Sequence, residues 1–228
     1  MPPFRRKSTP EPSADPDDWR PQRFGRSFRS IRDAVIEPSW GGVRVLARLD
    51  SGHTRFKDEA GVDCTAEFAE VADAVAAAAL AGELILDGFL TVEPTQVVAG
   101  RPLAEIEAPT AGRLMVEMIA GNRLMRRAAP ERPLDADRPV AFVAVDLLQI
   151  DGTRLLDVPL LERKRLLDSA LTESDLVRIT PFVRPPVGSF LSTWRGLGFT
   201  ALAYKAANSR YKPDARNDGW SIKPMPLK

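Results

Sequence analysis

Few side chains in this sequence are of the types that carry catalysis. The one histidine, His53, follows Asp-Ser-Gly in a turn between two short apolar segments, which predicts a solvated residue, and the one cysteine is Cys64. Ser39 carries a hydroxyl, but a hydroxyl is a weak nucleophile unless a neighbouring base takes its proton. No histidine lies beside it in the sequence. A single cysteine also excludes an intrachain disulfide framework and a multi-cysteine zinc site.

Hydrophobic spacing predicts the elements that position these residues. Alternating apolar residues predict a strand over residues 43–49, followed by the turn 50–52 and a short strand. Apolar residues at positions 68, 71, 75 and 79 predict a helix, with Thr65 as its N-cap and Gly82 at its end. The remaining expectations are strands at 83–92, 140–148, 177–182 and 201–205, a loop at 94–110, and helices near 114–127, after Pro159 and after Ser189. Strands and helices do not alternate regularly, which favours an α+β fold.

Six segments along the chain form an ordered set of motifs. The first is E-P-S-W-G-G-V-R at residues 37–44. The others are L-D-G-F-L at 86–90, F-V-A-V-D-L-L at 142–148, a helix at 160–167, G-F-T-A-L-A-Y-K at 198–205, and S-R-Y-K-P at 209–213 with a following Trp and Lys. In this order they resemble the adenylation (nucleotidyltransferase) domain of ATP-dependent DNA ligases of the bacterial end-joining type, which has E-P-K-x-D-G-x-R at the first segment. This resemblance implies the family fold, with antiparallel sheets flanking a nucleotide cleft and packed helices.

The residues that do chemistry in that family are replaced here. The lysine that attacks the α-phosphate of ATP is Ser39, and the aspartate that follows it is Gly41. The two carboxylates that hold and orient the divalent metal are Phe89 and Thr200. A family arginine is Glu59, a reversal of charge. The resemblance therefore implies no catalytic residue, no metal site and no cofactor, and ATP and Mg²⁺ would matter only if residual family activity persists.

Four residues of the family's nucleotide site remain: Glu37, Arg44, Lys205 and Lys223. The resemblance places them, as a vestigial nucleotide-binding set, around the base, ribose and phosphates. Arg44 and Lys205 can equally be strand residues that face solvent. Trp220 is expected to pack in the core or at its rim rather than stack on a base.

A formal net charge of +1 gives no global attraction to nucleic acid, so any such binding needs a local patch. Basic residues gather near the C-terminus, and four of them are tentative nucleic-acid contacts: Lys205, Arg210, Lys212 and Arg216. We expect weak, sequence-independent binding that falls steeply with salt. An unidentified protein partner is also expected, although no sequence feature identifies it.

Residues 1–25 are rich in Pro, Arg, Asp and Ser, which predicts a flexible N-terminal tail. Residues 26–228 are expected to form one ligase-like adenylation domain, with no C-terminal OB domain after it. No apolar run approaches the roughly 20 residues that span a bilayer, and no signal peptide is evident. With the single cysteine, these features predict a cytoplasmic protein without membrane contact.

The resemblance and the replaced residues together predict a catalytically degenerate homologue. Its function would be that of a non-catalytic binding or scaffolding module related to DNA repair. One alternative is an active ligase that uses a displaced lysine or a partner's OB domain, with Lys57 and Lys205 as the lysines to test first. The other is a purely structural subunit.

Overall fold

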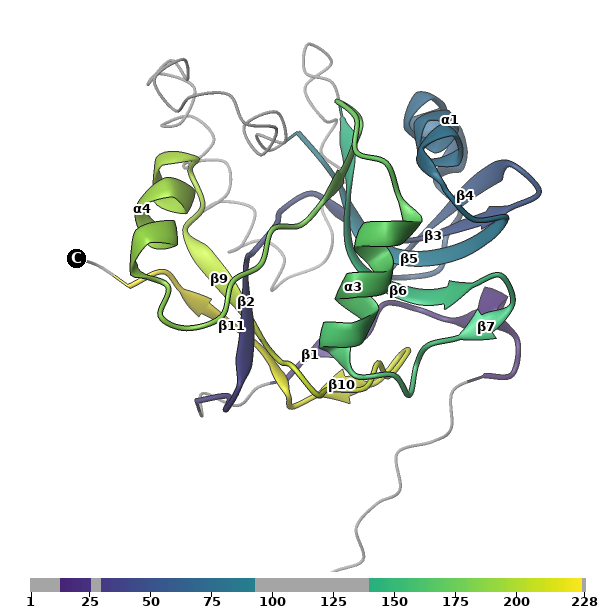
Figure 1. Cartoon of the computed structure of the whole chain (residues 1–228). Coiled ribbons are helices and arrows are strands. Elements are labelled where there is room, and N and C mark those ends of the chain that lie inside the picture. The colour runs from purple at the N-terminus through teal and green to yellow at the C-terminus, as the bar shows by residue number, and fades with distance from the viewer. Residues whose placement is uncertain (1–12, 26–29, 93–139, 227–228) are drawn as a thin grey trace, which may run out of the picture.

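The computed structural model describes residues 13–25, 30–92 and 140–226. Two mainly antiparallel sheets pack against each other (Figure 1). The larger has the order β4-β3-β5-β6-β7, with β8 parallel to β6: β3 Val43–Asp50, β4 His53–Asp58, β5 Glu83–Thr91, β6 Ala141–Ile150, β7 Thr153–Arg154 and β8 Val177–Ile179. The smaller has the order β11-β9-β2: β2 Ala34–Pro38, β9 Ala201–Ala206 and β11 Trp220–Pro224. The two short strands β1 Arg23–Phe24 and β10 Arg216–Asn217 pair in parallel.

The helical elements of the described residues are few and short: η1 Pro16–Asp18, η2 Thr65–Phe68, α1 Ala69–Ala78, α3 Leu160–Ala170 and α4 Gly188–Gly196. None of the helices in this part of the chain is long and apolar enough to cross a membrane. The expected α+β class and the paired antiparallel sheets are confirmed. The loop and helix expected between residues 94 and 127 lie outside the described residues.

The central strands β5 and β6 are buried on both faces, which explains why their sequences are apolar almost throughout. One face of the larger sheet packs against α1 and the C-terminal half of α3. Phe142 and Leu86 from the sheet meet Val75 of α1 and Leu167 of α3 in this cluster. Removing this apolar surface from water is the main favourable contribution to folding of the larger sheet.

Two further apolar clusters lie on the opposite face of the larger sheet. We call the first the Trp220 cluster: Trp19, Val35, Leu46, Ile85, Leu148, Leu156, Leu160, Ala207, Tyr211 and Trp220. The second is the Trp40 cluster: Ala34, Ile36, Trp40, Val143, Val145, Trp194, Leu197, Phe199, Leu202 and Met225, with Phe89 packed against it. Both join the two sheets, and the expectation that Trp220 packs in the core is confirmed, since its side chain is fully buried.

The N-terminal tail expected over residues 1–25 is wrong for its second half, because residues 13–25 are packed on the domain. Trp19 is 1% exposed and belongs to the Trp220 cluster. Gln22 is fully buried, and its side-chain oxygen accepts hydrogen bonds from the backbone of Lys212 and the side chain of Asn217. The overall composition of residues 1–25 is polar, but one buried indole and one buried amide hold residues 13–25 on the domain. Residues 1–12 lie outside the described residues.

One expected turn is confirmed and one expected cap is wrong. Ser51 and Gly52 both have positive φ, 51° and 78°, as a two-residue hairpin turn between β3 and β4 requires. Thr65 does not cap a helix through its own side chain. Its hydroxyl instead accepts a hydrogen bond from the backbone N–H of Phe56 at 2.9 Å, and the chain begins a 3₁₀ turn there.

Candidate functional site

Charged side chains are buried between the Trp220 and Trp40 clusters, where the two sheets meet. Four cations face three carboxylates in this region, and all seven are at least 95% buried. We call them the charge belt: Glu37, Arg44, Asp87, Asp146, Arg163, Lys164 and Lys205. Ionised groups are rarely buried unless they are paired, so each contact of the belt matters for stability.

Glu37 on β2 is held between two lysines. Lys205 on β9 donates a hydrogen bond to one carboxylate oxygen at 2.7 Å, and the amine of Lys164 on α3 lies 2.6 Å from the other. β2 and β9 are antiparallel neighbours, so Glu37 and Lys205 project from the same face of the small sheet. Both amines also lie over aromatic rings, Lys205 at 4.3 Å from the Trp220 centroid and Lys164 at 5.8 Å from that of Phe182.

The titration of Lys164 is displaced by its burial. Desolvation by burial is the largest cause that lowers its pKa to about 8; the negative charge of Glu37 opposes it, and the positive charge of Lys205 adds to it. The Lys164–Glu37 contact is short but not aligned as a hydrogen bond, since neither atom has a hydrogen-bond partner among the described residues. A misaligned ion pair compensates poorly for lost hydration, which is consistent with the lowered pKa.

Arg44 on β3 is fully engaged inside the protein. Its guanidinium makes a two-point contact with Asp87 on β5, at 3.0 and 2.7 Å. It also lies 5.6 Å from the ring centroid of Phe24 and 5.9 Å from that of Phe89. Burial works against the charge, but Asp87 raises the pKa of Arg44 above its ordinary value. Glu59, the residue of reversed charge, lies 3.8 Å away on the more exposed side.

The second buried arginine pair joins α3 to β6. Arg163 contacts both carboxylate oxygens of Asp146 at 2.8 and 2.7 Å, and both side chains are fully buried. Tyr211 completes the belt by donating its hydroxyl hydrogen to Asp87 at 2.8 Å and accepting from the backbone N–H of Gln22 at 3.0 Å. Burial, together with the charge of Asp87, raises the pKa of Tyr211 well above 10.0.

The position of the family nucleophile lies where β2 ends. Ser39 is half-buried, and its backbone N–H donates to the carbonyl of Ala201 at 3.0 Å. Trp40 next to it is 6% exposed, donates from its indole to the Thr180 hydroxyl at 2.8 Å, and packs edge-on against Phe199. The chain then turns at Gly42, whose φ of +96° and whose missing Cβ, which would lie 2.2 Å from the carbonyl oxygen of Leu90, both require glycine.

The two positions of the family carboxylates are apolar or neutral here. Phe89 is partly buried against the Trp40 cluster and lies beside Arg44, and Thr200 is half-buried, with its carbonyl accepting from Met225 at 2.7 Å. The three belt carboxylates do not fit a divalent metal, because their oxygens already contact arginine or lysine. Among the described residues, no group of three or more His, Cys, Asp or Glu side chains is arranged to hold an ion.

The expected nucleotide residues are only partly brought together. Glu37 and Lys205 are in direct contact and Arg44 belongs to the same belt, so of the two alternatives for Arg44 and Lys205 the one in which they face solvent is wrong. Lys223 projects from the other face of the small sheet, because it pairs with Leu202 in the antiparallel register, and it lies 5.2 Å from the ring centroid of Tyr204.

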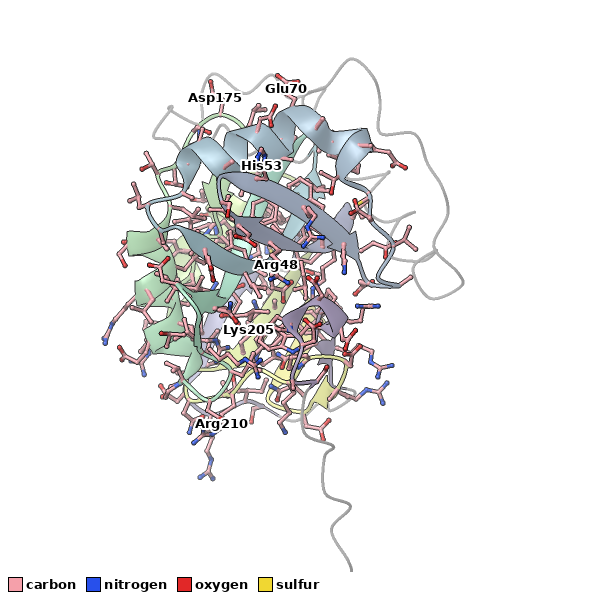
Figure 2. The ribbon with its side chains drawn as sticks, turned by 90° about the vertical axis from the view of Figure 1, so that its right-hand side faces the viewer. Arg48, His53, Glu70, Asp175, Lys205 and Arg210 are labelled. Carbon is pink, nitrogen blue, oxygen red and sulfur yellow. The ribbon has the colours of Figure 1, made fainter. Side chains whose placement is uncertain are left out.

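The expected C-terminal nucleic-acid patch does not form as one surface. Lys205 is 2% exposed and lies inside the molecule, whereas Arg210 lies at its edge and contacts the Asp157 side chain at 2.8 Å (Figure 2). Lys212 and Arg216 are exposed. The sequence brings these four residues close along the chain, but β9 carries Lys205 into the core while the following turns stay at the surface.

Four belt residues were absent from the sequence expectations: Asp87, Asp146, Arg163 and Lys164. A signal for them existed. Asp87 and Asp146 interrupt otherwise apolar strands and lie directly opposite each other in the β5–β6 register. Like charges in that arrangement are destabilising, so each needs a cation from elsewhere. Arg44 of β3 supplies it to Asp87 and Arg163 of α3 supplies it to Asp146, whereas the adjacent Lys164, also on the buried side of α3, contacts Glu37.

Comparisons with known proteins agree with this architecture. Residues 24–223 match the family model described as ATP dependent DNA ligase domain. A probable DNA ligase of Streptomyces coelicolor is 32% identical over 199 residues, covering 84% of this chain and 35% of that protein. The multifunctional non-homologous end joining DNA repair protein LigD of Mycobacterium tuberculosis is 27% identical over 187 residues, covering 82% of this chain and 21% of that protein. The chain therefore spans about a third or less of the length of these relatives.

Two solved structures have the same fold. The crystal structure of the ligase domain of M. tuberculosis LigD aligns with a TM-score of 0.63 and 22% identity, covering 92% of this chain and 60% of that chain. A mycobacterial DNA ligase D complexed with ATP and MES aligns with a TM-score of 0.59 and 22% identity, covering 91% and 60%.

Proposed function

Because this chain belongs to the ATP dependent DNA ligase domain family, we propose that it is a non-catalytic member of that family, which serves as a binding or scaffolding module in DNA repair. The family and the repair protein among its relatives support the second part. A cytoplasmic location and an unidentified protein partner remain predictions alongside it.

The observation that carries the proposal is how closely the side chains between the two sheets are paired and packed. The belt charges that would meet a nucleotide are paired with one another, and Trp40, Phe89 and Phe199 fill the adjoining space. An amine nucleophile is needed to form a phosphoramide with AMP, and Ser39 offers a hydroxyl without a neighbouring histidine. Opening this region to ATP would mean unpairing buried ions, which is strongly unfavourable.

The test is incubation of the purified chain with α-labelled ATP and Mg²⁺, followed by denaturing electrophoresis. We expect no covalent AMP. The Ser39→Lys variant should also remain unlabelled, because a single restored group lacks the partners through which it acts. An acid-labile labelled band from the unmodified chain would overturn the proposal.

One observation favours the alternative of an active enzyme with a displaced lysine. Nucleophilic lysines need a lowered pKa, and burial lowers the pKa of Lys164 to about 8. Its side chain is 1% exposed and lies against Glu37, which argues against attack on a bound nucleotide. If a labelled band forms, its loss in Lys164→Arg but not in Lys57→Arg would identify Lys164 as the nucleophile.

A further inference from the structure

Strands β3 and β4 carry three cations on the face of the larger sheet that points away from α1. Arg48 and Arg55 are direct cross-strand partners, and Lys57 lies two residues along β4 from Arg55. Like charges placed directly opposite each other destabilise a sheet. These positions therefore require an anion between them or in front of them.

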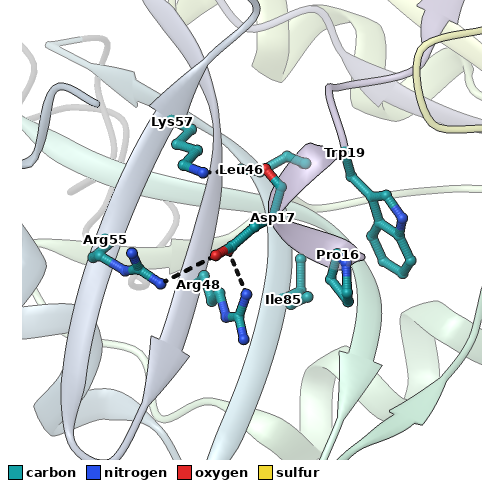
Figure 3. Close-up of a pocket in the computed structure, with 8 residues that line it drawn as sticks. All are labelled: Pro16, Asp17, Trp19, Leu46, Arg48, Arg55, Lys57 and Ile85. Atoms are coloured by element: carbon teal, nitrogen blue, oxygen red, sulfur yellow. Dashed lines mark hydrogen bonds and ion pairs between the residues drawn. The ribbon is translucent and has the colours of Figure 1, made fainter. Parts of the chain in front are cut away.

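The anion in this structure is a carboxylate of the chain itself. Arg48 donates a hydrogen bond to the Asp17 carboxylate, Arg55 lies 3.7 Å from its other oxygen, and Lys57 donates to the Asp17 backbone carbonyl at 3.1 Å (Figure 3). The charges of these cations lower the pKa of Asp17 although partial burial opposes them. We call residues 13–18, with Asp15, Asp17 and Asp18, the acidic turn.

A fourth cation meets the same segment from β7. Arg154 donates to the carbonyl of Ala14, and its guanidinium lies 5.6 Å from the ring centroid of Trp19. We call Arg48, Arg55, Lys57 and Arg154 the basic face. Every one of the four therefore contacts the segment from Ala14 to Trp19, which carries three acidic residues.

The acidic turn is held lightly over this face. No residue of η1 is buried, and the Asp17 side chain is 37% exposed. A cavity of about 20 Å³ remains beneath it, with Arg48, Arg55 and Lys57 of the basic face in its lining, which is room for about one water. The contact is therefore polar and partly solvated, and such contacts are screened by salt. Trp19 is the buried anchor of this segment, and its indole donates a hydrogen bond to the Ser13 carbonyl at 2.9 Å.

We propose that the basic face is a binding surface for the phosphate backbone of nucleic acid, and that the acidic turn is its internal competitor. The choice of nucleic acid as the ligand rests on the proposed DNA-related binding function. The choice of this surface rests on the contacts of its four cations. Closely spaced arginine and lysine side chains bind phosphate in the way they bind the Asp17 carboxylate here, but with more charge per partner. This surface is distinct from the C-terminal residues named from the sequence.

The test neutralises the acidic turn without removing its hydrogen bonds. Asp15 accepts from the Asp17 backbone and Asp18 accepts from Ser13, and asparagine can accept in both places, so the variant is Asp15→Asn, Asp17→Asn, Asp18→Asn. The matched control is Glu67→Gln, Glu70→Gln, Asp73→Asn, which changes net charge equally at exposed positions of η2 and α1 on the far side of the sheet (Figure 2). Binding to a fluorescein-labelled DNA duplex is measured by anisotropy at several salt concentrations.

We expect the acidic-turn variant to bind about tenfold more tightly than the unmodified chain at low salt, the effect expected from losing the two partly exposed ion pairs of Asp17. The control should change affinity less than about twofold. Adding Arg55→Gln and Lys57→Gln to the acidic-turn variant should reverse the gain and reduce the log–log salt slope by about 2, since each lost phosphate contact removes about 0.9. Both added positions are at least partly exposed, so the fold should be kept.

Three outcomes would overturn the proposal. The control could tighten binding as much as the acidic-turn variant, which would indicate net charge alone. The added glutamines could leave the gain unchanged, which would place the surface elsewhere. Polyglutamate could displace the duplex as well as unlabelled DNA does, which would indicate an acidic protein partner. A covalent AMP adduct would overturn the proposed non-catalytic function and leave this comparison of affinities intact.

Discussion

The charge belt and the basic face both consist of arginine and lysine side chains that contact carboxylates. They differ in burial, because the belt is inside the protein and the basic face is partly exposed to water. In the belt, Arg163 and Asp146 are both fully buried. On the basic face, the side chains of Arg48 and Asp17 are 30% and 37% exposed. Removing one partner of a buried pair leaves a charge without water or counterion, whereas an exposed partner is replaced by solvent and salt. We therefore expect the belt to hold the two sheets together. We expect the carboxylate of the acidic turn to be replaceable by another anion.

The largest effect should come from removing the carboxylate that two belt lysines share. Glu37→Gln keeps the shape of the side chain but leaves Lys164 and Lys205 without an anion. We expect the free energy of unfolding in urea to fall by about 3–5 kcal/mol. The surface control Glu70→Gln should stay within about 0.5 kcal/mol. A loss for Glu37→Gln as small as that of the control would mean that the belt is hydrated in solution.

The next effect is a pH dependence caused by Lys164. Its pKa falls from 10.5 to about 8 on folding, so between these values the unfolded chain binds a proton that the folded chain has released. The free energy of unfolding therefore rises with pH between about 8 and 10.5, by up to about 3 kcal/mol. Below pH 8 Lys164 is charged in the folded protein too, so the full cost of burying the charge applies there.

The variant Lys164→Met removes the titrating amine, so comparing it with the unmodified chain isolates the contribution of Lys164 to the pH dependence of stability. The raised pKa of the Cys64 thiol, about 11, acts in the opposite direction above pH 9 but is common to both proteins. The difference in unfolding free energy between the unmodified chain and Lys164→Met should therefore change between pH 8 and 10.5. A difference that is constant with pH would show that Lys164 titrates normally.

A smaller loss is expected at the hydroxyl that links the belt to the N-terminal segment. Tyr211→Phe removes the bond to Asp87 and the acceptor for the Gln22 backbone, but Asp87 keeps both contacts with Arg44. We expect a loss of about 2 kcal/mol in thermal or urea unfolding. Phe142→Tyr is not a suitable control because it would bury a new hydroxyl, so the exposed Phe190→Tyr serves instead.

The smallest effect belongs to the exposed pair. Asp17→Asn should lower the free energy of unfolding by less than about 1 kcal/mol, and the loss should vanish in high salt. Measuring Asp17→Asn and Glu37→Gln over one salt series gives the sharpest form of the comparison. If the two variants showed equal salt dependence, the ion pairs of Asp17 could not be solvent-exposed while those of Glu37 are buried.

Much of the fold follows from the sequence because its signals are local or ordered along the chain. The alternation in β3, the turn residues Ser51 and Gly52, and the six family segments predicted the sheets correctly. The packing of residues 13–25 was missed because a composition average hides one indole. Trp19 is the fully buried apolar anchor of that segment, and Phe24 packs against the same cluster.

The candidate site was harder to predict because its partners are distant in the sequence. Glu37 was identified from the resemblance, but its contact with Lys164 depends on how α3 lies against the small sheet. The sequence also could not tell whether Arg44 and Lys205 face solvent, since a basic residue in a strand is compatible with either face. Burial of these charges is decided by the meeting of two sheets, which is a tertiary property.

The small sheet is assembled from opposite ends of the chain, and this sets the order in which the protein can fold. β2 pairs with β9, more than 160 residues later, and Trp220 packs with Trp19. Contacts of such sequence separation form late, after the local hairpins β3–β4 and β6–β7. During synthesis, Glu37 must therefore wait in water until Lys205 leaves the ribosome. In nascent chains stalled before β9, we expect protease to cut at β2 while α1 and the strands it packs on are already protected. The Glu37 carboxylate at the centre of the belt is therefore among the last groups to lose its hydration.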